Sequence, residues 1–436
     1  MSELQAERAA PEAGLAPPRR GGPAAWLGAQ LREPYVKLVA SQLLTGGVAL
    51  AANILMVRAL SPSGRGEVAL ILQVVYLATQ VLLLGTERSF VASYHDVTPA
   101  AAVRAYARLL VVPGGLMLSA AAAFAVLAPE RLDPGPVVIA LIAGYALAEA
   151  SSLATRAIAI CVGRVRDFLY ARIVESLLLL AMLVTLFVAG TSQPAVWIGA
   201  YLLSGALPTI AYLVLWLRLP APAAGPLTRN RTVRSEGLAL FPAALSNMAM
   251  LRADRLALPV LASTSALGLY ASVATMTELL AWPLRAYADS RLGKWRATHR
   301  EGALRTRPIV AAAVAYCLVV APIAAGGLYL GIVPVFGEQY APAKAVVLPL
   351  VAAAGLYAVS RISLGLLIAR GHSALVSAAE ITGFAVSFAA YLLLIPPLGI
   401  LGAAYGSLLG YGSCLLFALV TSRITGDRGR HHDVAA

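Results

Sequence analysis

Residues 237–262 read GLALFPAALSNMAMLRADRLALPVLA, an apolar stretch that contains three charged residues, Arg252, Asp254 and Arg255. An α-helix rises ~1.5 Å per residue and crosses a ~30 Å hydrocarbon core in about 20 residues. The stretch therefore predicts a transmembrane helix. Each charge at the centre of such a helix costs roughly 2.5–3.5 kcal/mol on insertion scales, so the three charges are expected to face partners or a wet cavity.

The same pattern recurs along the whole chain. Hydrophobic residues make up 59% of the 436 positions and charged residues only 13%, whereas charged residues make up roughly a quarter of soluble domains. Twelve spans are predicted, at 36–57, 67–86, 105–128, 136–160, 169–189, 195–217, 237–262, 266–284, 308–330, 345–369, 373–394 and 399–420. We expect an all-α polytopic membrane protein, because barrel strands would be shorter and would alternate in polarity.

An interruption rich in Pro, Gly and Arg divides the twelve spans six and six. The predicted organisation is a disordered cytoplasmic tail at 1–33, a six-helix lobe at 34–218, a cytoplasmic linker at 219–236, a second six-helix lobe at 237–421 and a cytoplasmic tail at 422–436. Each half has an even number of spans, so the two lobes would be related by a pseudo-two-fold axis along the membrane normal. Parallel repeats of this kind are typical of transporters whose site lies between two lobes.

Weak internal similarity supports a duplication. A shift of 202 residues aligns Ser61, Ser63, Gly66 and Ala69 with Ser263, Ser265, Gly268 and Ala271, and a shift of 203 aligns Gly199, Ala200 and Ser204 with Gly402, Ala403 and Ser407. Both matches fall at corresponding places in the two halves.

Basic residues predict the orientation. With the N-terminus inside, 27 of the 34 Lys and Arg residues lie on the inner side, while Arg58, Arg65, Arg131 and Lys344 lie outside. Positive residues near short loops are retained in the cytoplasm, so both termini are predicted to be cytoplasmic. The net charge of +13 then reflects topology and indicates no nucleic-acid partner. The composition, rich in Ala and in Arg over Lys, suggests a bacterial source and hence the plasma (inner) membrane. No cleaved signal peptide is expected, because the first apolar stretch is long.

The chain offers little catalytic chemistry. It has no P-loop, HExxH or GxSxG motif, and its predicted outer loops are short. Its three cysteines and five histidines are scattered, which predicts neither a metal site nor a disulfide framework, and no cofactor is expected. A membrane enzyme such as a glycan polymerase or ligase would need a sizeable outer loop, so we predict that the protein is not an enzyme. A scaffold without transport activity is an alternative.

Three arginines define the predicted substrate site. Arg252 and Arg255 are 60° apart on a helix and share a face, and Arg361 lies at similar depth in its own span. If all three face inward they make a cationic cavity, and guanidinium groups suit bidentate binding of phosphate. Arg58, at the outer end of the first span, and Asn247 complete the predicted set.

Acidic residues leave a second interpretation open. Asp254, Glu149, Glu175, Glu278 and Glu380 could pair with these arginines in a purely structural lattice of ion pairs. Asp254 and Glu149 are also the candidates for coupling transport to H⁺ or Na⁺.

Several stretches resemble the polysaccharide and O-antigen (Wzx-type) flippases of the multidrug/oligosaccharidyl-lipid/polysaccharide exporter superfamily. They are LSPSGRGEVALILQVVYLATQVLLLGTERSFVASY (60–94), RADRLALPVLASTSALGLYASVATMTEL (252–279), PVFGEQYAPAKAVVLPLVAAAGLYAVSRISLGLLIARG (334–371) and YLLLIPPLGILGAAYGSLLGYG (391–412). The resemblance covers about 36–421. It implies twelve helices in two lobes around a V-shaped cavity that opens alternately to either side.

The resemblance also implies a function. Such flippases move undecaprenyl-diphosphate-linked oligosaccharides from the inner to the outer leaflet for cell-surface polysaccharide synthesis. A polyprenyl-diphosphate-linked glycan, membrane lipids, H⁺ or Na⁺ and a polysaccharide polymerase are then the expected partners. The alternative is a cation-coupled exporter of drugs or cations from the same superfamily, which predicts an acidic or aromatic cavity.

Overall fold

The computed structural model describes residues 34–94, 97–127, 135–219 and 230–432, apart from the side chains of 34–44, 240, 243–244, 246–247 and 425–432. Residues 41–436 form one compact unit.

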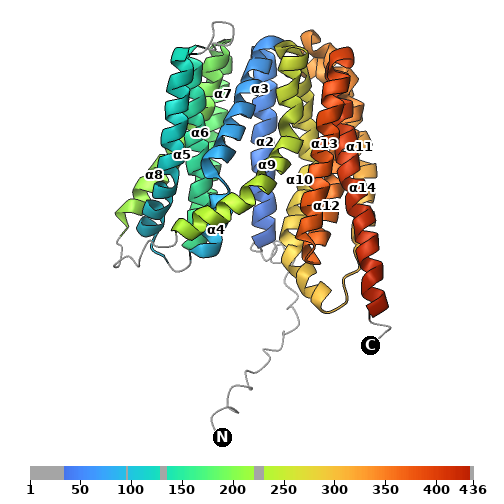
Figure 1. The fold of residues 1–436 in the computed structure, drawn as a ribbon. Coiled ribbons are helices and arrows are strands. Elements are labelled where there is room, and N and C mark those ends of the chain that lie inside the picture. Colours follow the sequence, from blue (N-terminus) through green and yellow to red (C-terminus); the bar gives the residue numbers. More distant parts are fainter. Residues whose placement is uncertain (1–33, 95–96, 128–134, 220–229, 433–436) are drawn as a thin grey trace, which may run out of the picture. The chain divides into compact units, whose positions relative to one another are not determined.

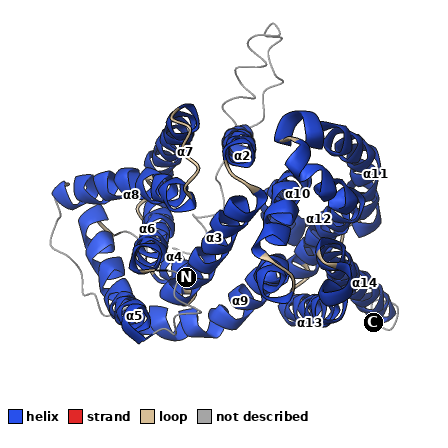
Figure 2. Ribbon diagram, turned by 90° about the horizontal axis from the view of Figure 1, so that it is seen from above, coloured by secondary structure: helices blue, strands red, loops and turns tan. Residues whose placement is uncertain are grey.

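Every regular element in the described ranges is a helix (Figure 2). The helices are α2 (Pro34–Ala59), α3 (Pro62–Leu83), α4 (Thr86–Ser93), α5 (Pro99–Leu127), α6 (Pro136–Cys161), α7 (Val165–Val188), α8 (Pro194–Arg218), α9 (Asn230–Leu261), α10 (Thr264–Arg300), α11 (Thr306–Gly331), α12 (Val347–Ala369), α13 (Ser373–Leu398) and α14 (Ile400–His432), with a π-helical turn η3 (Ile332–Phe336) and a 3₁₀ segment η4 (Glu338–Val346) before α12 (Figure 1). Each of the twelve predicted spans falls mainly on one long helix, although the span at 67–86 runs past the end of α3 to the start of α4, and the span at 345–369 begins in η4.

The helices have the length and composition of membrane spans. Among the described residues, nine helical stretches are long and apolar enough to cross a bilayer, and residues 45–59 of α2 form a shorter apolar stretch. The charged helices α9 and α10 are not among the nine. The prediction of an all-helical, multi-pass membrane protein is confirmed.

Both halves begin a helix with the same local cap. The Ser61 hydroxyl accepts a hydrogen bond from the Gly64 N–H at 3.2 Å, before α3, and the Ser263 hydroxyl accepts from the Ala266 N–H at 3.0 Å, before α10. A serine cap satisfies one of the amides that the first turn of a helix leaves free. The two caps are related by the 202-residue shift found in the sequence.

The capped ends of α3 and α10 touch through their backbones, and the helices lie side by side in Figure 2. A Cβ atom added at Gly66 would lie 1.9 Å from the Thr264 carbonyl oxygen, and one added at Gly268 would lie 1.8 Å from the Pro62 carbonyl oxygen. The shift of 202 residues converts each of these contacts into the other. Only glycine permits this approach, because it has no side chain.

Buried apolar side chains form two clusters. One extends over residues 52–233. The other extends over 250–418 and also includes Val57 and Ala69 from the first half of the chain. Two clusters that divide near the middle of the chain fit a two-lobe organisation. The predicted boundaries of the lobes, tails and linker stay predictions.

Three helices extend beyond their apolar spans. Helix α9 begins at Asn230, inside the predicted linker, and its first turns pack on α4, where the Ser89 hydroxyl donates to the Val233 carbonyl at 2.8 Å. Helix α10 continues to Arg300 and α14 to His432. Residues 220–229 of the linker and the tails 1–33 and 433–436 lie outside the described residues.

Candidate functional site

Three cavities meet at Arg252. The central cavity, about 270 Å³, is lined by α2, α3, α6, α7, α8, α9 and α10. The second-half cavity, about 290 Å³, is lined by α9, α10, α12 and α14. The α4 cavity, about 880 Å³, is lined by α3, α4, α6, α7, α9 and α10. Arg252 lines all three, so the charged stretch in α9 lies at their junction.

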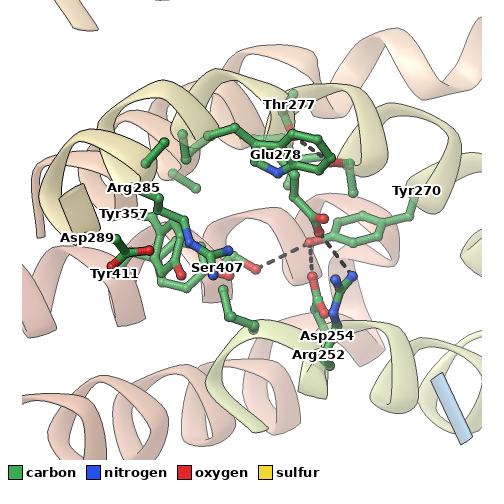
Figure 3. A pocket seen from close by; sticks show the side chains of 18 residues that line it. Arg252, Asp254, Tyr270, Thr277, Glu278, Arg285, Asp289, Tyr357, Ser407 and Tyr411 are labelled. Carbon is green, nitrogen blue, oxygen red and sulfur yellow. Dashed lines mark hydrogen bonds and ion pairs between the residues drawn. The ribbon is translucent and has the colours of Figure 1, made fainter. Parts of the chain in front are cut away.

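Arg252 and Arg255 share one carboxylate. The Glu278 Oε1 atom of α10 accepts from Arg252 Nη1 at 3.2 Å and from Arg255 Nη2 (Figure 3 shows Arg252 and Glu278). The Arg252 guanidinium also lies 5.5 Å from the centre of the Tyr76 ring, a cation–π contact. Two positive charges against one negative charge leave a surplus at this point.

Asp254 makes no ion pair with any described residue. Its carboxylate accepts from the Tyr270 hydroxyl at 2.6 Å and from the Arg255 backbone N–H at 2.7 Å. The Tyr270 hydroxyl lies 3.2 Å from the Ser407 hydroxyl, which lies 2.9 Å from that of Tyr391. Asp254 therefore begins a chain of buried hydroxyl groups at the wall of the second-half cavity (Figure 3).

Arg361 lies apart from the other two predicted arginines. It pairs with Glu380 of α13 at 2.9 Å and lies 5.7 Å from the centre of the Tyr357 ring. Arg361 lines none of the three cavities. The structure does not bring Arg361 together with Arg252 and Arg255, because depth along a helix does not determine the direction of a side chain.

Arg58 and Asn247 add nothing to the described site. The exposed Arg58 guanidinium donates to the Pro334 and Val335 carbonyls of η3 and ties the end of α2 to that turn. Arg58 lines none of the three cavities. Asn247 is in α9, but its side chain lies outside the described part of the chain.

Glu149 of α6 faces the cavities without a direct partner. It lines both the central and the α4 cavity and makes no hydrogen bond or ion pair with another described residue. The nearby Arg172 is already bound to Glu175, with Nη1 at 2.7 and 2.8 Å from the two carboxylate oxygens. Glu149 and Asp254 are thus the two described acids at these cavities that are not exposed and that have no paired arginine.

Arg65 is the site residue that the sequence analysis missed. It lines the central cavity and is only 3% exposed, although the charge pattern places it in an outer loop. Its Nη2 donates to the Asn53 side-chain oxygen at 2.9 Å, and its Nε and Nη1 atoms have no hydrogen-bond partner among the described residues. Helical spacing could have pointed to Arg65 as a cavity residue. It lies at helical intervals from Ala69, Gln73 and Tyr76, and all four residues line this cavity.

The walls of the central and α4 cavities carry an excess of positive charge. Their described lining includes seven arginines, at 65, 88, 156, 172, 252, 255 and 285, and four glutamates, at 87, 149, 175 and 278, a surplus of three. The predicted ion-pair lattice exists in part, because Glu175, Glu278 and Glu380 each bind an arginine. Among the described residues, Arg65 has no acidic partner.

Solved structures of other proteins share this fold. No protein-family profile and no curated protein sequence matches the chain. Among solved structures, an inward-facing multidrug resistance MATE family transporter of the MOP superfamily matches with a TM-score of 0.65 at 14% identity, covering 90% of this chain and 98% of that one. The lipid II flippase MurJ, in an inward closed conformation, matches with a TM-score of 0.67 at 10% identity, covering 89% and 87%. This is the fold of MATE transporters and MurJ.

The likeness extends over nearly the whole chain. A point mutant of the Vibrio cholerae MATE transporter VcmN matches with a TM-score of 0.51 at 16% identity and covers 92% of this chain and 97% of that one. The structures named here are transporters and a flippase. At these sequence identities the likeness shows a shared membrane-transporter fold and does not identify the substrate.

Proposed function

We propose that the protein is a flippase that moves a lipid-linked oligosaccharide, carried on undecaprenyl diphosphate, from the inner to the outer leaflet by alternating access. The observation that supports this is the surplus of arginines on the walls of the central and α4 cavities. A diphosphate needs several positively charged donors, and a neutral or cationic drug does not.

The diphosphate would lie between Arg65 and the pair Arg252 and Arg255. All three line the central cavity, and Arg65 has two guanidinium nitrogens without a partner. A bidentate phosphate satisfies such nitrogens, which otherwise cost free energy in a buried position. Arg361 and Arg58 are not needed for this site.

The glycan would cross through the wet cavities while the lipid tail stays in the bilayer. The α4 cavity gives room on the side that the charge pattern assigns to the cytoplasm, where Arg88, Arg156 and Arg285 line it. The Gly66–Gly268 contact would close the opposite side. We place the protein in the bacterial plasma membrane with both termini cytoplasmic, upstream of a polysaccharide polymerase.

Asp254 and Glu149 would couple reorientation to H⁺ or Na⁺ uptake. Each carboxylate lies at a cavity wall without a paired arginine. Neutralising either acid would then uncouple transport from the ion gradient without removing the arginines that hold the diphosphate.

A drug or cation exporter is the second candidate. It is favoured by the aromatic side chains Tyr76, Tyr145, Tyr201 and Trp282 in the central cavity and by the unpaired Glu149. Rings and a carboxylate would together attract an organic cation.

Lipids that co-purify with the protein distinguish the two functions. We would express the wild type, Arg252→Gln/Arg255→Gln and a control, Arg296→Gln/Arg300→Gln, in a bacterial host that makes polyprenyl-diphosphate glycans. The control removes two exposed charges from α10 that line none of the three cavities. Mass spectrometry should find the glycan lipid on the wild type and the control, and at least about tenfold less on the cavity variant.

Two results would contradict the flippase. Equal retention of the glycan lipid by all three proteins would mean that the two arginines do not bind it. Absence of the lipid from every sample, together with binding of a cationic dye that Glu149→Gln abolishes, would favour the exporter.

A further inference from the structure

A separate basic pocket lies among α11, α12 and α14. Its volume is about 530 Å³, and it shares no lining residue with the three cavities at Arg252. Three arginines, Arg307, Arg370 and Arg423, line it together with the hydroxyl residues Thr306, Ser363 and Ser422. Acidic side chains are absent from its described lining.

Arg370 forms a fixed cationic wall of the basic pocket. Its Nη1 donates to the Ser422 carbonyl at 3.1 Å and to the Ser422 hydroxyl at 3.0 Å, and its Nη2 donates to the Thr306 hydroxyl at 3.1 Å. These bonds hold the guanidinium in place between α11 and α14 but supply no negative charge.

Arg307 and Arg423 supply two further charges. Both are exposed, and neither makes an ion pair with a described residue. Helix α11 begins at Thr306 without a side-chain cap, so the positive end of its dipole adds to the same field. Among the described residues, the three guanidinium groups have no acid beside them in the pocket lining, an arrangement that attracts an anion.

The remaining wall of the basic pocket is apolar. Val310, Ala311, Leu366 and Leu419 line it. All three helices are membrane spans, and the pocket lies at the ends that the charge pattern assigns to the cytoplasm. Positive charges next to an apolar wall at a membrane surface match a lipid that has an anionic headgroup and acyl chains.

We infer that this basic pocket binds the headgroup phosphate of an anionic phospholipid, with the acyl chains along α11 and α14. The lipid would brace the inner ends of α11, α12 and α14. The inference does not depend on the cargo of the central cavity, because the two sites share no residue.

Selective retention of a lipid tests the inference. The full-length protein would be reconstituted into phosphatidylcholine vesicles that contain a minority of phosphatidylglycerol, extracted in mild detergent and examined by native mass spectrometry. The wild type should retain phosphatidylglycerol in preference to phosphatidylcholine. Arg307→Gln/Arg423→Gln should retain less, by about fivefold for each arginine removed. The control Arg296→Gln/Arg300→Gln should behave like the wild type.

Three results would overturn it. Equal losses in the pocket variant and the control would indicate only a general attraction of positive charge to anionic vesicles. Equal retention of the two lipids by the wild type would show that the pocket has no preference for an anionic headgroup. Third, thermal stabilisation of the wild type by inorganic phosphate as large as that by short-chain phosphatidylglycerol would indicate a site for a free anion.

Discussion

Glu278 is more exposed than Glu380, the other acid that pairs with an arginine in the second half of the described chain. Its side chain is 36% exposed, against 9% for Glu380, and a single oxygen serves two arginines. If a diphosphate is the cargo, its oxygens compete with this carboxylate for the same guanidinium groups. Glu278 would then pair with Arg252 and Arg255 when no substrate is bound, and the diphosphate would replace it as their partner.

Glu278→Gln is therefore expected to tighten binding. Removing the competing charge should lower the Kd for farnesyl diphosphate by about tenfold, equivalent to about 1.4 kcal/mol, and slow its release. Isothermal titration of the detergent-solubilised protein measures the Kd. Glu380→Gln, which loses an ion pair outside the cavities, should leave the Kd unchanged.

The opposite result has a clear meaning. If Glu278 only stabilises the fold, its removal leaves two positive charges close together without compensation. Binding would then weaken together with thermal stability, and the carboxylate would have no part in exchange with the substrate.

The candidate site could be predicted from the sequence only in part. Arg252 and Arg255 stood out because charge inside an apolar stretch is rare. Arg65 escaped notice because it follows a Ser-Pro-Ser-Gly turn, where an arginine is ordinary. Glu278 is 26 and 23 residues along the chain from the two arginines it binds, and Glu380 is 19 residues from Arg361. Such pairings depend on how helices pack.

Helices α3 and α10 meet at Gly66 and Gly268. A methyl group at either position would overlap a carbonyl oxygen of the other helix, and no side-chain rotation relieves an overlap with backbone. Overpacking of this kind costs about 1–3 kcal/mol. The close contact of the two helices is therefore sensitive to a single carbon atom.

Gly66→Ala should favour a state in which α3 and α10 separate. We expect labelling of a Thr275→Cys reporter in the central cavity by an impermeant maleimide, added outside intact cells, to rise several-fold. The reporter would be placed in a chain whose three cysteines are replaced by alanine. Gly199→Ala is the matched control, because a methyl there meets nothing within 4 Å. Identical labelling of the two variants would show that the contact does not close the outer side.

Helix positions were easier to predict than helix ends. Hydropathy located the spans because nine of the helical stretches are long and strongly apolar, and because the charged helices α9 and α10 still contain apolar stretches. It missed the extensions of α9, α10 and α14 because these continue as charged helices, in which backbone hydrogen bonding persists after the apolar composition stops.

The distribution of arginine along the whole chain predicts its orientation in the membrane. Green fluorescent protein fused after Ala436 should fluoresce, because it folds in the cytoplasm. Alkaline phosphatase fused after Thr191, between α7 and α8, should be active, because it requires the outer side. The reverse pattern of the two activities would invert the topology and move the basic pocket to the outer surface.

The reciprocal contact of α3 and α10 has a consequence for how the chain can change. A contact in which each partner repeats the other is isologous, the kind that two copies of a shorter chain form around a two-fold axis. In such an interface, substitution by a larger residue on one side is usually offset by substitution by a smaller residue on the other. Here both positions are already glycine, so a larger residue at one cannot be offset by a smaller residue at the other, and we expect Gly66 and Gly268 to be retained together.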